Sequence, residues 1–272
     1  MTLSINYIYM LMDRSRWFLK KILMFPILLI VSFWSIQNHA TAVTKSREAY
    51  EKTGNVVWEI NTKEKLVAIT FDDGPHPVFT PQILEILAKY NAKATFFVAG
   101  NKAERFPEVL KRVAKEGHEV GNHTYSHLIT SKISAVKLTE ELKRTDNIIQ
   151  GITGNKPILY RPVAGIYNDV IINTAIKNGK FVILWSWDQD PRDWRNPPAN
   201  QITRYVTKGI NPGDIIVLHD WHGSEFSQAC QTVMALDDIL SYLSTKGYKS
   251  VTVSEMLYRS KTNYPEPFFP FH

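Results

Sequence analysis

The sequence predicts a parallel α/β fold of about seven strands, closed or nearly closed into a barrel. Two observations carry this prediction: short runs rich in β-branched and aromatic residues alternate with helix-like runs, and polar residues directly follow most of the short runs. In parallel α/β folds the carboxyl ends of the strands gather at one edge, where ligands and catalytic groups collect. The polar residues that follow the strands are therefore the candidate functional residues.

The first 42 residues have the pattern of a targeting segment. Four basic residues precede the apolar run 22–36, and Ala40-Thr41-Ala42 follows it, which is the order of a secretory signal. The apolar run of 15 residues is shorter than the roughly 20 that a membrane-spanning helix needs, and Pro26 interrupts it. We expect cleavage after Ala42, with retention as an N-terminal membrane anchor as the alternative. Either outcome predicts a secreted or cell-surface protein.

The charge of the chain is largely a property of this segment. Removing residues 1–42 lowers the formal charge from +6 to +3, because they hold four basic residues and one acid. No cluster of Lys and Arg is interleaved with aromatic residues, so a nucleic-acid partner is not expected, whereas mild positive charge suits an anionic cell-wall surface. The single cysteine, Cys230, excludes an internal disulfide and a cysteine-rich zinc site, and we interpret it as a small core hydrophobe in a helical stretch.

The remaining elements follow in chain order. Residues 43–64 are expected to form a linker and an edge segment, residues 65–258 the domain, and residues 259–272 a C-terminal tail. The predicted strands are 66–71, 94–99, 118–120, 158–160, 181–184, 214–218 and 248–250. The predicted helices are 80–90, 105–116, 135–150, 169–178, 201–208 and 232–245. Thr80-Pro81 supplies an N-cap and a proline at the first helical position, and Gly117, Gly151 and Gly179 mark three helix ends.

The first predicted strand ends in two adjacent carboxylates, Asp72 and Asp73. It is short and rich in β-branched residues, and Gly74-Pro75 closes it, as expected of a buried strand that ends in a turn. Successive side chains of an extended segment point in different directions, so the two acids can take different roles, one on a metal and one on a proton. The dipeptides Asp-Gly and Gly-Pro also fit a plain turn.

The third strand is followed by His123 and His127. On a helical turn this spacing places both imidazoles on one face, as a metal site requires, although two surface histidines on a helix give the same pattern. Together with an Asp from another strand end they would form a three-ligand site with positions open for water and substrate. Secretion and the lack of a cysteine cluster favour a hydrolytic metal such as zinc over a redox centre.

Three later strands also end in candidate residues. Arg161 follows the fourth strand, where it is either a surface residue or a guanidinium that orients an acidic base and lowers the pKa of that base. The fifth strand is followed by three acids, Asp188, Asp190 and Asp193. The same segment holds Trp194, with Trp185 and Trp187 nearby. These rings offer apolar surface for a sugar ring, although tryptophans are more often core. His219 ends the sixth strand level with the Asp pair, a position that suits a proton donor, although a lone histidine is more often a core or surface residue.

Five segments in this order resemble the motifs of the polysaccharide deacetylases, also known as carbohydrate esterase family 4 or the NodB-homology domain. The matching segments are 70–75, 123–127, 161–165, 190–194 and 217–219. The resemblance covers roughly residues 66–257. It implies a distorted (β/α) barrel with fewer repeats than the usual eight, and an enzyme that removes acetyl groups from N-acetylated sugars.

The resemblance also implies a role for each matching residue. The metal ligands would be Asp73, His123 and His127, with zinc as the expected ion and cobalt, manganese or nickel as alternatives. The catalytic residues would be the base Asp72, the acid His219, and their partners Arg161 and Asp193. The substrate-binding residues would be Trp194 and Leu218, which line a slot for the acetyl methyl group, and Ala164, near whose backbone N–H the oxyanion would lie.

One motif departs from the family pattern, because Val163 and Ala164 stand where the family usually has proline and then an aromatic residue. A backbone donor survives this change, but the loop loses rigidity and the cleft loses one wall.

From the resemblance and the targeting segment together, we predict a metal-dependent N-deacetylase that acts on peptidoglycan, beside which a signal or anchor would leave it. The alternatives are chitin oligomers or another poly-N-acetylglucosamine, xylan O-acetyl groups, a glycan-binding protein without turnover, and a domain whose acids and histidines are structural.

Overall fold

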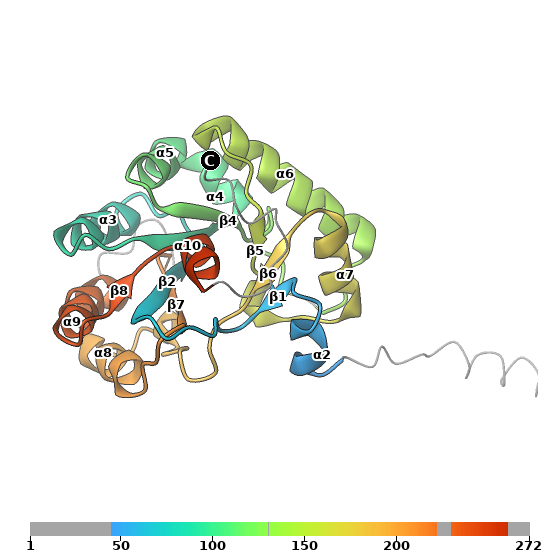
Figure 1. Cartoon of the computed structure of the whole chain (residues 1–272). Helices are drawn as coiled ribbons and strands as arrows, with labels where there is room; N and C mark the ends of the chain where they lie inside the picture. Colours follow the sequence, from blue (N-terminus) through green and yellow to red (C-terminus); the bar gives the residue numbers. More distant parts are fainter. Residues whose placement is uncertain (1–44, 130, 222–229, 261–272) are drawn as a thin grey trace, which may run out of the picture. The chain divides into compact units, whose positions relative to one another are not determined.

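The computed structural model describes residues 45–129, 131–221 and 230–260. Eight strands form a parallel sheet in the order β1-β6-β5-β4-β3-β2-β7, with β8 paired to β2 (Figure 1). Their bounds are β1 (Val56–Val57), β2 (Leu66–Asp72), β3 (Ala94–Val98), β4 (Glu119–Asn122), β5 (Leu159–Tyr160), β6 (Phe181–Ile183), β7 (Ile215–His219) and β8 (Lys249–Ser250). The parallel α/β prediction is therefore confirmed.

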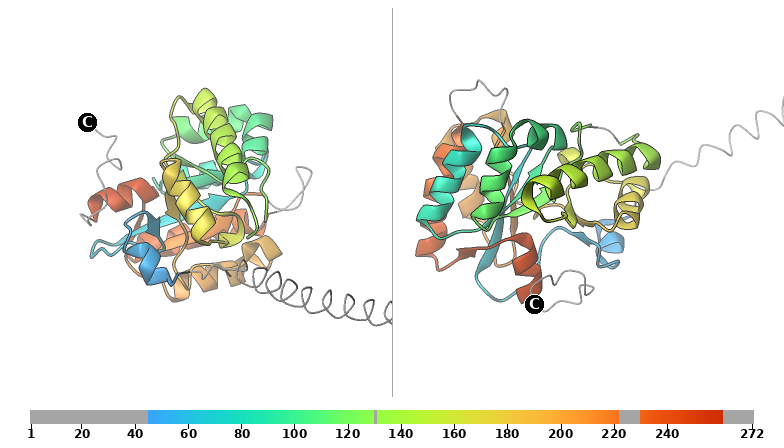
Figure 2. Two further views of the ribbon diagram at one scale, coloured as in Figure 1. Left: turned by 90° about the vertical axis from the view of Figure 1, so that its right-hand side faces the viewer. Right: turned by 90° about the horizontal axis from the view of Figure 1, so that it is seen from above.

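Helices surround the strands, and α6 and α7 pack against each other on the outside of the sheet (Figures 1 and 2). The helices are α2 (Arg47–Glu51), α3 (Phe79–Lys89), α4 (Gly100–Arg105), α5 (Pro107–Lys115), α6 (Ala135–Thr153), α7 (Asp169–Lys177), α8 (Ala199–Lys208), α9 (Gln231–Thr245) and α10 (Val253–Arg259). Within the described residues none of these helices is long and apolar enough to cross a bilayer. The predicted targeting segment and most of the predicted tail lie outside the described residues.

The sheet curves into a distorted barrel, because loop residues join its β1–β6 edge to its β7 edge through hydrogen bonds. After β6, the N–H of Ser186 donates to the carbonyl of Ile215 at 3.0 Å, and the N–H of Val217 donates to the carbonyl of Gln189 at 3.0 Å. The N–H of Ile60, beyond β1, donates to the carbonyl of Gly213 at 3.0 Å. A β-carbon at Gly213 would lie 1.7 Å from the Ile60 oxygen, so this close approach requires glycine.

Strand β2 lies between β3 and β7, and all seven of its residues are buried. The register pairs Asp72 at its end with His219 on β7. On the other side, β3 pairs Val98 with Asn122 of β4, and Asn122 pairs in turn with Tyr160 of β5. The residues that follow β4 and β5 therefore emerge at the same edge of the sheet as the two carboxylates.

Several predicted boundaries differ from the structure. The predicted helix 105–116 is the end of α4 followed by α5, because Pro107 cannot continue a helix from Phe106 but suits the first turn of a new one. Helix α6 continues through Gly151 and ends at Gly154, whose φ of 80° supplies the left-handed cap. The predicted linker contains α2 and β1, and Cys230 is buried but precedes α9.

Candidate active site

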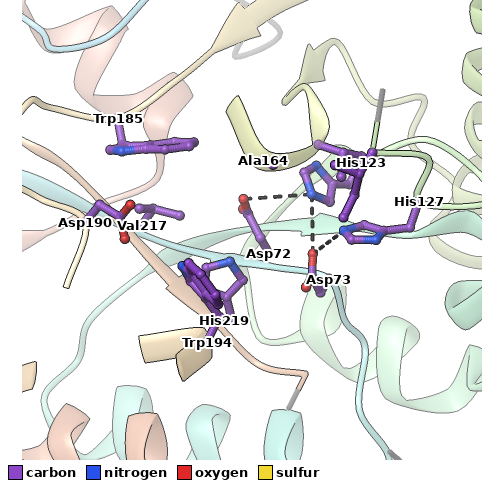
Figure 3. A pocket seen from close by; sticks show the side chains of 12 residues that line it. Asp72, Asp73, His123, His127, Ala164, Trp185, Asp190, Trp194, Val217 and His219 are labelled. Atoms are coloured by element: carbon purple, nitrogen blue, oxygen red, sulfur yellow. Dashed lines mark ion pairs between the residues drawn. The ribbon is translucent and has the colours of Figure 1, made fainter. Parts of the chain in front are cut away.

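The two carboxylates at the end of β2 face different partners, as expected from their adjacent positions. Asp72 is the last residue of the strand, whereas Asp73 leaves it with a φ of 78°, in the left-handed region. The Oδ1 atom of Asp72 lies 2.7 Å from Nη1 of Arg161. The Oδ1 atom of Asp73 lies 2.7 Å from Nε2 of His127 and 3.4 Å from Nε2 of His123 (Figure 3).

Asp73, His123 and His127 form a group that fits a divalent metal ion. Each offers one ligand atom, and these atoms all lie within 4.8 Å of one another. The Nδ1 atom of His123 lies 2.7 Å from the Arg161 carbonyl oxygen, which can only accept, so Nδ1 carries the proton and Nε2 faces Asp73 with a free lone pair. Burial opposes charge on Asp73, but the two adjacent imidazoles outweigh burial and hold the pKa of Asp73 well below the usual value. Two imidazoles and a carboxylate are a donor set of catalytic zinc sites.

The histidine pair does not lie on a helical turn, so that part of the prediction is wrong. Thr124 and His127 have φ values of 67° and 54°, and this backbone folds the loop back on itself. Glu141, a buried residue of α6, accepts hydrogen bonds at 2.9 and 2.7 Å from the N–H groups of residues 125–126. The two imidazoles therefore converge on Asp73 because a distant glutamate holds the loop between them.

Arg161 is fully buried, and its side chain donates four hydrogen bonds. Its Nη1 atom donates to Oδ1 of Asp72 at 2.7 Å and to Oγ1 of Thr70 at 2.6 Å. Its Nε and Nη2 atoms donate to the carbonyls of Ile183 and Leu184 at 3.0 and 2.9 Å. Arg161 thus occupies Oδ1 of Asp72, whereas Oδ2 lies 3.9 Å from Nε2 of His123, on the side of the pocket where it can accept a proton.

Replacing Arg161 with alanine is expected to lower the free energy of unfolding by about 3–5 kcal/mol, because the buried Asp72 charge loses its partner. Urea denaturation measures this loss. Arg204→Ala on the exposed side of α8 is the matched control, and we expect it to change stability by about 0.5 kcal/mol or less. A loss for Arg161→Ala no larger than that of the control would contradict the structural role.

Asp193 holds His219 in a fixed orientation. Asp193 is fully buried in the short helix η2 (Asp193–Arg195), and its Oδ1 atom lies 2.7 Å from Nδ1 of His219. Its Oδ2 atom accepts hydrogen bonds from the His219 N–H at 2.8 Å and from Thr232 Oγ1 at 2.6 Å. Burial disfavours a charged imidazole, but the Asp193 carboxylate, with smaller contributions from Asp73 and Asp72, outweighs burial and raises the pKa of His219 to about 10. His219 therefore carries a proton at neutral pH.

These groups meet in one cavity of about 330 Å³. In the view of Figure 3, Asp72 lies between the histidine pair and His219. The cavity is lined by Asp72, Asp73, His123, His127, Ile129, Val163, Ala164, Trp185, Asp190, Trp194, Val217 and His219. Arg161 and Asp193 do not line the cavity. As the resemblance implies, Arg161 contacts Asp72 and Asp193 contacts His219.

Leu218 is not among the residues that line this cavity. It is fully buried in the hydrophobic core, whereas Val217 lines the cavity. Side chains alternate along a strand, so the residue on the same face as His219 is two positions earlier, at Val217. The expectation that Leu218 would form the apolar wall overlooked this period of two.

The loop residues Ile129, Trp185 and Asp190 also line the cavity without a predicted site role. The sequence leaves Trp185 undecided between core and site, and the structure places it in the wall of the cavity that the half-exposed Trp194 also lines. Asp188 is exposed and lies outside the cavity lining. The conformation of the loop decides which of several adjacent acidic and aromatic side chains faces the cavity, and no periodic pattern in the sequence predicts that conformation.

Ala164 lines the cavity with an unusual backbone conformation. Its φ of 54° and ψ of 21° lie in the left-handed region, which costs a non-glycine residue of order 1–3 kcal/mol and persists where surrounding structure enforces it. The next residue, Gly165, also has a positive φ, and a β-carbon there would lie 2.5 Å from the Trp185 ring. The loop after Arg161 is therefore held in one shape by its packing against Trp185, although it lacks the family's proline and aromatic residue.

Comparison with known proteins gives a consistent result. The model of the polysaccharide deacetylase family matches residues 59–182. A relative from Bacillus cereus named peptidoglycan-N-acetylglucosamine deacetylase is 46% identical over 211 residues, which cover 78% of this chain and 97% of the relative. A Bacillus subtilis relative named peptidoglycan-N-acetylmuramic acid deacetylase PdaC is 36% identical over 197 residues, 72% of this chain and 40% of the relative.

Solved structures agree with this similarity. The crystal structure of the Bc1960 peptidoglycan N-acetylglucosamine deacetylase, in complex with 4-naphthalen-1-yl-N-oxidanyl-benzamide, superposes with a TM-score of 0.72 at 34% sequence identity. The match covers 78% of this chain and 96% of that chain. The fold, the order of the motifs and the extent of these matches together show that the chain belongs to the polysaccharide deacetylase family.

Proposed function

We propose that this chain is a metal-dependent hydrolase that removes the N-acetyl group from N-acetylglucosamine in peptidoglycan. The observation that carries the proposal is the convergence of the Asp73, His123 and His127 group with Asp72 and His219 in one cavity. The names of the relatives support peptidoglycan as the substrate. The overall reaction consumes water and yields acetate and a glucosamine residue.

Asp73, His123 and His127 would hold the metal ion, for which we propose zinc. When bound, such an ion polarises a carbonyl oxygen and lowers the pKa of water. The residues around it complete the proton transfers. Asp72 accepts the proton of the attacking water on the oxygen that Arg161 leaves free, and a backbone N–H near Ala164 would stabilise the developing oxyanion.

His219 acts at the other end of the reaction. As the C–O bond forms and the C–N bond breaks, the nitrogen of the leaving sugar needs a proton. His219 carries one at neutral pH, and Asp193 fixes its ring through Nδ1, so Nε2 is the atom that delivers it. Trp194 and Val217 supply apolar cavity wall on the same side, where the acetyl methyl group would lie.

Replacing Asp193 with asparagine is expected to lower kcat by about 10²-fold and to move the alkaline limb of the kcat/KM profile to lower pH. The active form of His219 is protonated, and its population falls once the pH exceeds its pKa. The Asp193 carboxylate is the largest cause that raises this pKa, which is about 10, so removing its charge lowers the pKa and makes activity disappear at lower pH. Rates measured between pH 6 and 10 test this. Thr232→Val, which removes a hydrogen bond to Asp193 but keeps its charge, is the control.

The contact between Asp193 and His219 also makes the free energy of unfolding depend on pH. The pKa of His219 in the folded protein lies above its ordinary value of 6.5, so the stabilisation by Asp193 is fully present below pH 6.5 and is lost as the pH rises through about 10. For the activity profile, an alkaline limb of kcat/KM that stays at the same pH in Asp193→Asn would contradict the assignment of His219 as the acid.

We also propose that the protein works at the cell surface, with residues 1–42 as a cleavable signal or a retained anchor. The support is the order of basic, apolar and small residues in the sequence. The mass of the extracellular form tests this: a chain that begins at Val43 indicates cleavage, a full-length chain in the membrane fraction indicates an anchor, and a cytoplasmic chain contradicts both.

The substrate is tested by acetate release from purified peptidoglycan and from N-acetylglucosamine oligomers in parallel, with the deacetylated sugar identified by mass spectrometry. We expect release from peptidoglycan with glucosamine as the new amino sugar. Faster release from the oligomers would reassign the protein as a chitooligosaccharide deacetylase, and de-N-acetylated muramic acid would reassign the sugar. No release from any of them, with metal bound, would contradict the proposal and favour a glycan-binding protein.

A further inference from the structure

Helix α6 contacts the segment that carries the two histidines through a second buried acid, Asp146. Its partner is Asn122, the last residue of β4, which directly precedes His123. The Nδ2 atom of Asn122 donates to Oδ1 of Asp146 at 2.8 Å and to the carbonyl of Leu142 at 2.9 Å. Asn122 is fully buried, so α6 determines the position of its side chain.

The other end of the Asn122 side chain holds the backbone that follows His123. Its Oδ1 atom accepts a hydrogen bond from the N–H of Thr124 at 2.8 Å. Thr124 has a φ of 67°, which a β-branched residue rarely adopts. Thr124 is also buried, so without this acceptor its N–H would be unpaired and shielded from water. Asn122 therefore stabilises an unfavourable backbone conformation between the two histidines.

Asp146 forms an ion pair with Lys180, which directly precedes β6. The Nζ atom of Lys180 lies 2.6 Å from Oδ1 of Asp146, and it also donates to the carbonyl of Pro157. The side chains of Lys180 and Asp146 are only 1% and 6% exposed. Oδ1 of Asp146 accepts from both Lys180 and Asn122. A continuous series of contacts thus leads from Lys180 to the backbone of the histidine segment.

The free energy of unfolding alone does not account for a pair of charges at this depth. Removing both ions from water costs so much that an apolar pair of similar volume often stabilises a protein equally well or better. The pair does fix geometry, however. An ionised carboxylate can only accept hydrogen bonds, so Asn122 must turn its NH₂ group toward Asp146 and its oxygen toward the N–H of Thr124.

We propose that the buried Asp146–Lys180 pair positions the metal-binding histidines by fixing the orientation of the Asn122 amide. Asn122 and Asp146 are then positioning residues for the site. The inference rests on the proposed function, which assigns a metal ion to Asp73, His123 and His127. It extends that function, because it makes metal affinity depend on side chains that contact none of the three ligand side chains.

The test compares two double variants in the full chain, Asp146→Asn/Lys180→Met and Asp146→Leu/Lys180→Met. Both remove the two charges together, so neither leaves a buried ion unpaired. They differ in one property, because asparagine at this position can still accept a hydrogen bond from Asn122 and leucine cannot. The probe is cobalt alone, added to the metal-free protein, since its absorption spectrum reports both binding and ligand geometry.

We expect the cobalt dissociation constant to rise about tenfold in Asp146→Leu/Lys180→Met and less than threefold in Asp146→Asn/Lys180→Met. The spectrum of bound cobalt should change in the leucine variant only. Urea denaturation of the metal-free proteins should show the leucine variant to be at least as stable as the unaltered chain. This combination of weaker metal binding and intact stability is the result that a merely structural ion pair would not give.

Asn122→Leu tests the same step if the double variant does not fold, because it removes the acceptor for Thr124 and leaves the ion pair in place. Its cobalt affinity should fall about 10–100-fold. Glu119→Gln is the control. Glu119 begins β4 at the other end of the strand from Asn122, and its carboxylate accepts from Thr95 and Ser254. This variant should bind cobalt normally.

Three results would overturn the inference. Unchanged cobalt affinity in both double variants would disconnect the ion pair from the metal site. An equal loss in both would show that the hydrogen bond to Asn122 is not the link. A loss of the same size in Glu119→Gln would show that any change to a carboxylate on this strand weakens the site.

These measurements need no turnover, so the inference and the proposed function fail separately. Affinities in the expected order support the inference even if no glycan releases acetate. Affinities that do not follow this order overturn it even if the unaltered protein is an active deacetylase. Hydrogen exchange at the Thr124 amide of the metal-free chain adds a direct readout: it should be faster in the leucine variant than in the asparagine variant, and equal rates would also overturn the inference.

Discussion

Replacing Asp72 with asparagine is expected to lower kcat by roughly 10²–10⁴-fold, because the reaction loses its general base. Asparagine keeps the size of the side chain and an oxygen that can accept from Arg161, so the fold should persist. The three proposed metal ligands are unchanged, and the metal content should equal that of the unaltered protein. Acetate release under saturating substrate, together with the metal-to-protein ratio, measures both expectations.

Asp190→Asn is the matched control, because it makes the same chemical change in the same cavity at a carboxylate that we place away from the proton transfers. Its kcat should change by no more than a few-fold. Retention of kcat in Asp72→Asn would show that another group is the base. If the variant is inactive but its effect on cells is unchanged, glycan binding and not turnover is the biological role.

Replacing His127 with alanine is expected to remove both bound metal and detectable activity. His127 is one of two imidazoles in the Asp73 group, and removing it leaves two ligands where catalytic sites of this type use three. Its side chain is 26% exposed, so the loss of packing is small and the protein should remain folded. Metal content after gel filtration and acetate release in micromolar zinc give the two readouts.

His118→Asn is the control for His127→Ala, because His118 is a histidine remote from the cavity that binds the backbone N–H of Ala94. It should retain the metal and turn over at the normal rate. Full metal content in His127→Ala would remove His127 from the ligand set. Normal turnover by a metal-free His127→Ala protein would remove the metal from the mechanism altogether.

The sequence identified which strands carry the site because parallel strands end at one edge. Once the segments that end in Asp72, His123, Arg161 and His219 are identified as strands, their polar ends must gather, and the register between β2 and β7 places Asp72 opposite His219. The pairing of Arg161 with Asp72 came from the family resemblance, and the hydrogen bond at 2.7 Å matches it. Short buried strands were found because their composition is distinctive.

The sequence did not predict features that depend on the contacts of loops. The histidine loop takes its shape from Glu141, a residue of α6 that no local pattern connects to it. Val217 lines the cavity because it lies two positions before His219 on the same face of β7, which the motif alone does not indicate. The position of Trp185 in the cavity wall depends on its packing against Gly165. Local sequence therefore predicted the chemistry at the strand ends, while tertiary contacts set the shape of the cavity.

The most direct test of the central claim is a titration of the metal-free chain with zinc while acetate release from peptidoglycan is recorded. We predict that activity rises in proportion to added zinc, stops rising at one ion per chain, and disappears when a chelator is added. Full activity in the metal-free chain, or binding of one zinc ion with no acetate released from any N-acetylated glycan, would contradict the assignment of the Asp73, His123 and His127 site as the centre of a metal-dependent deacetylase.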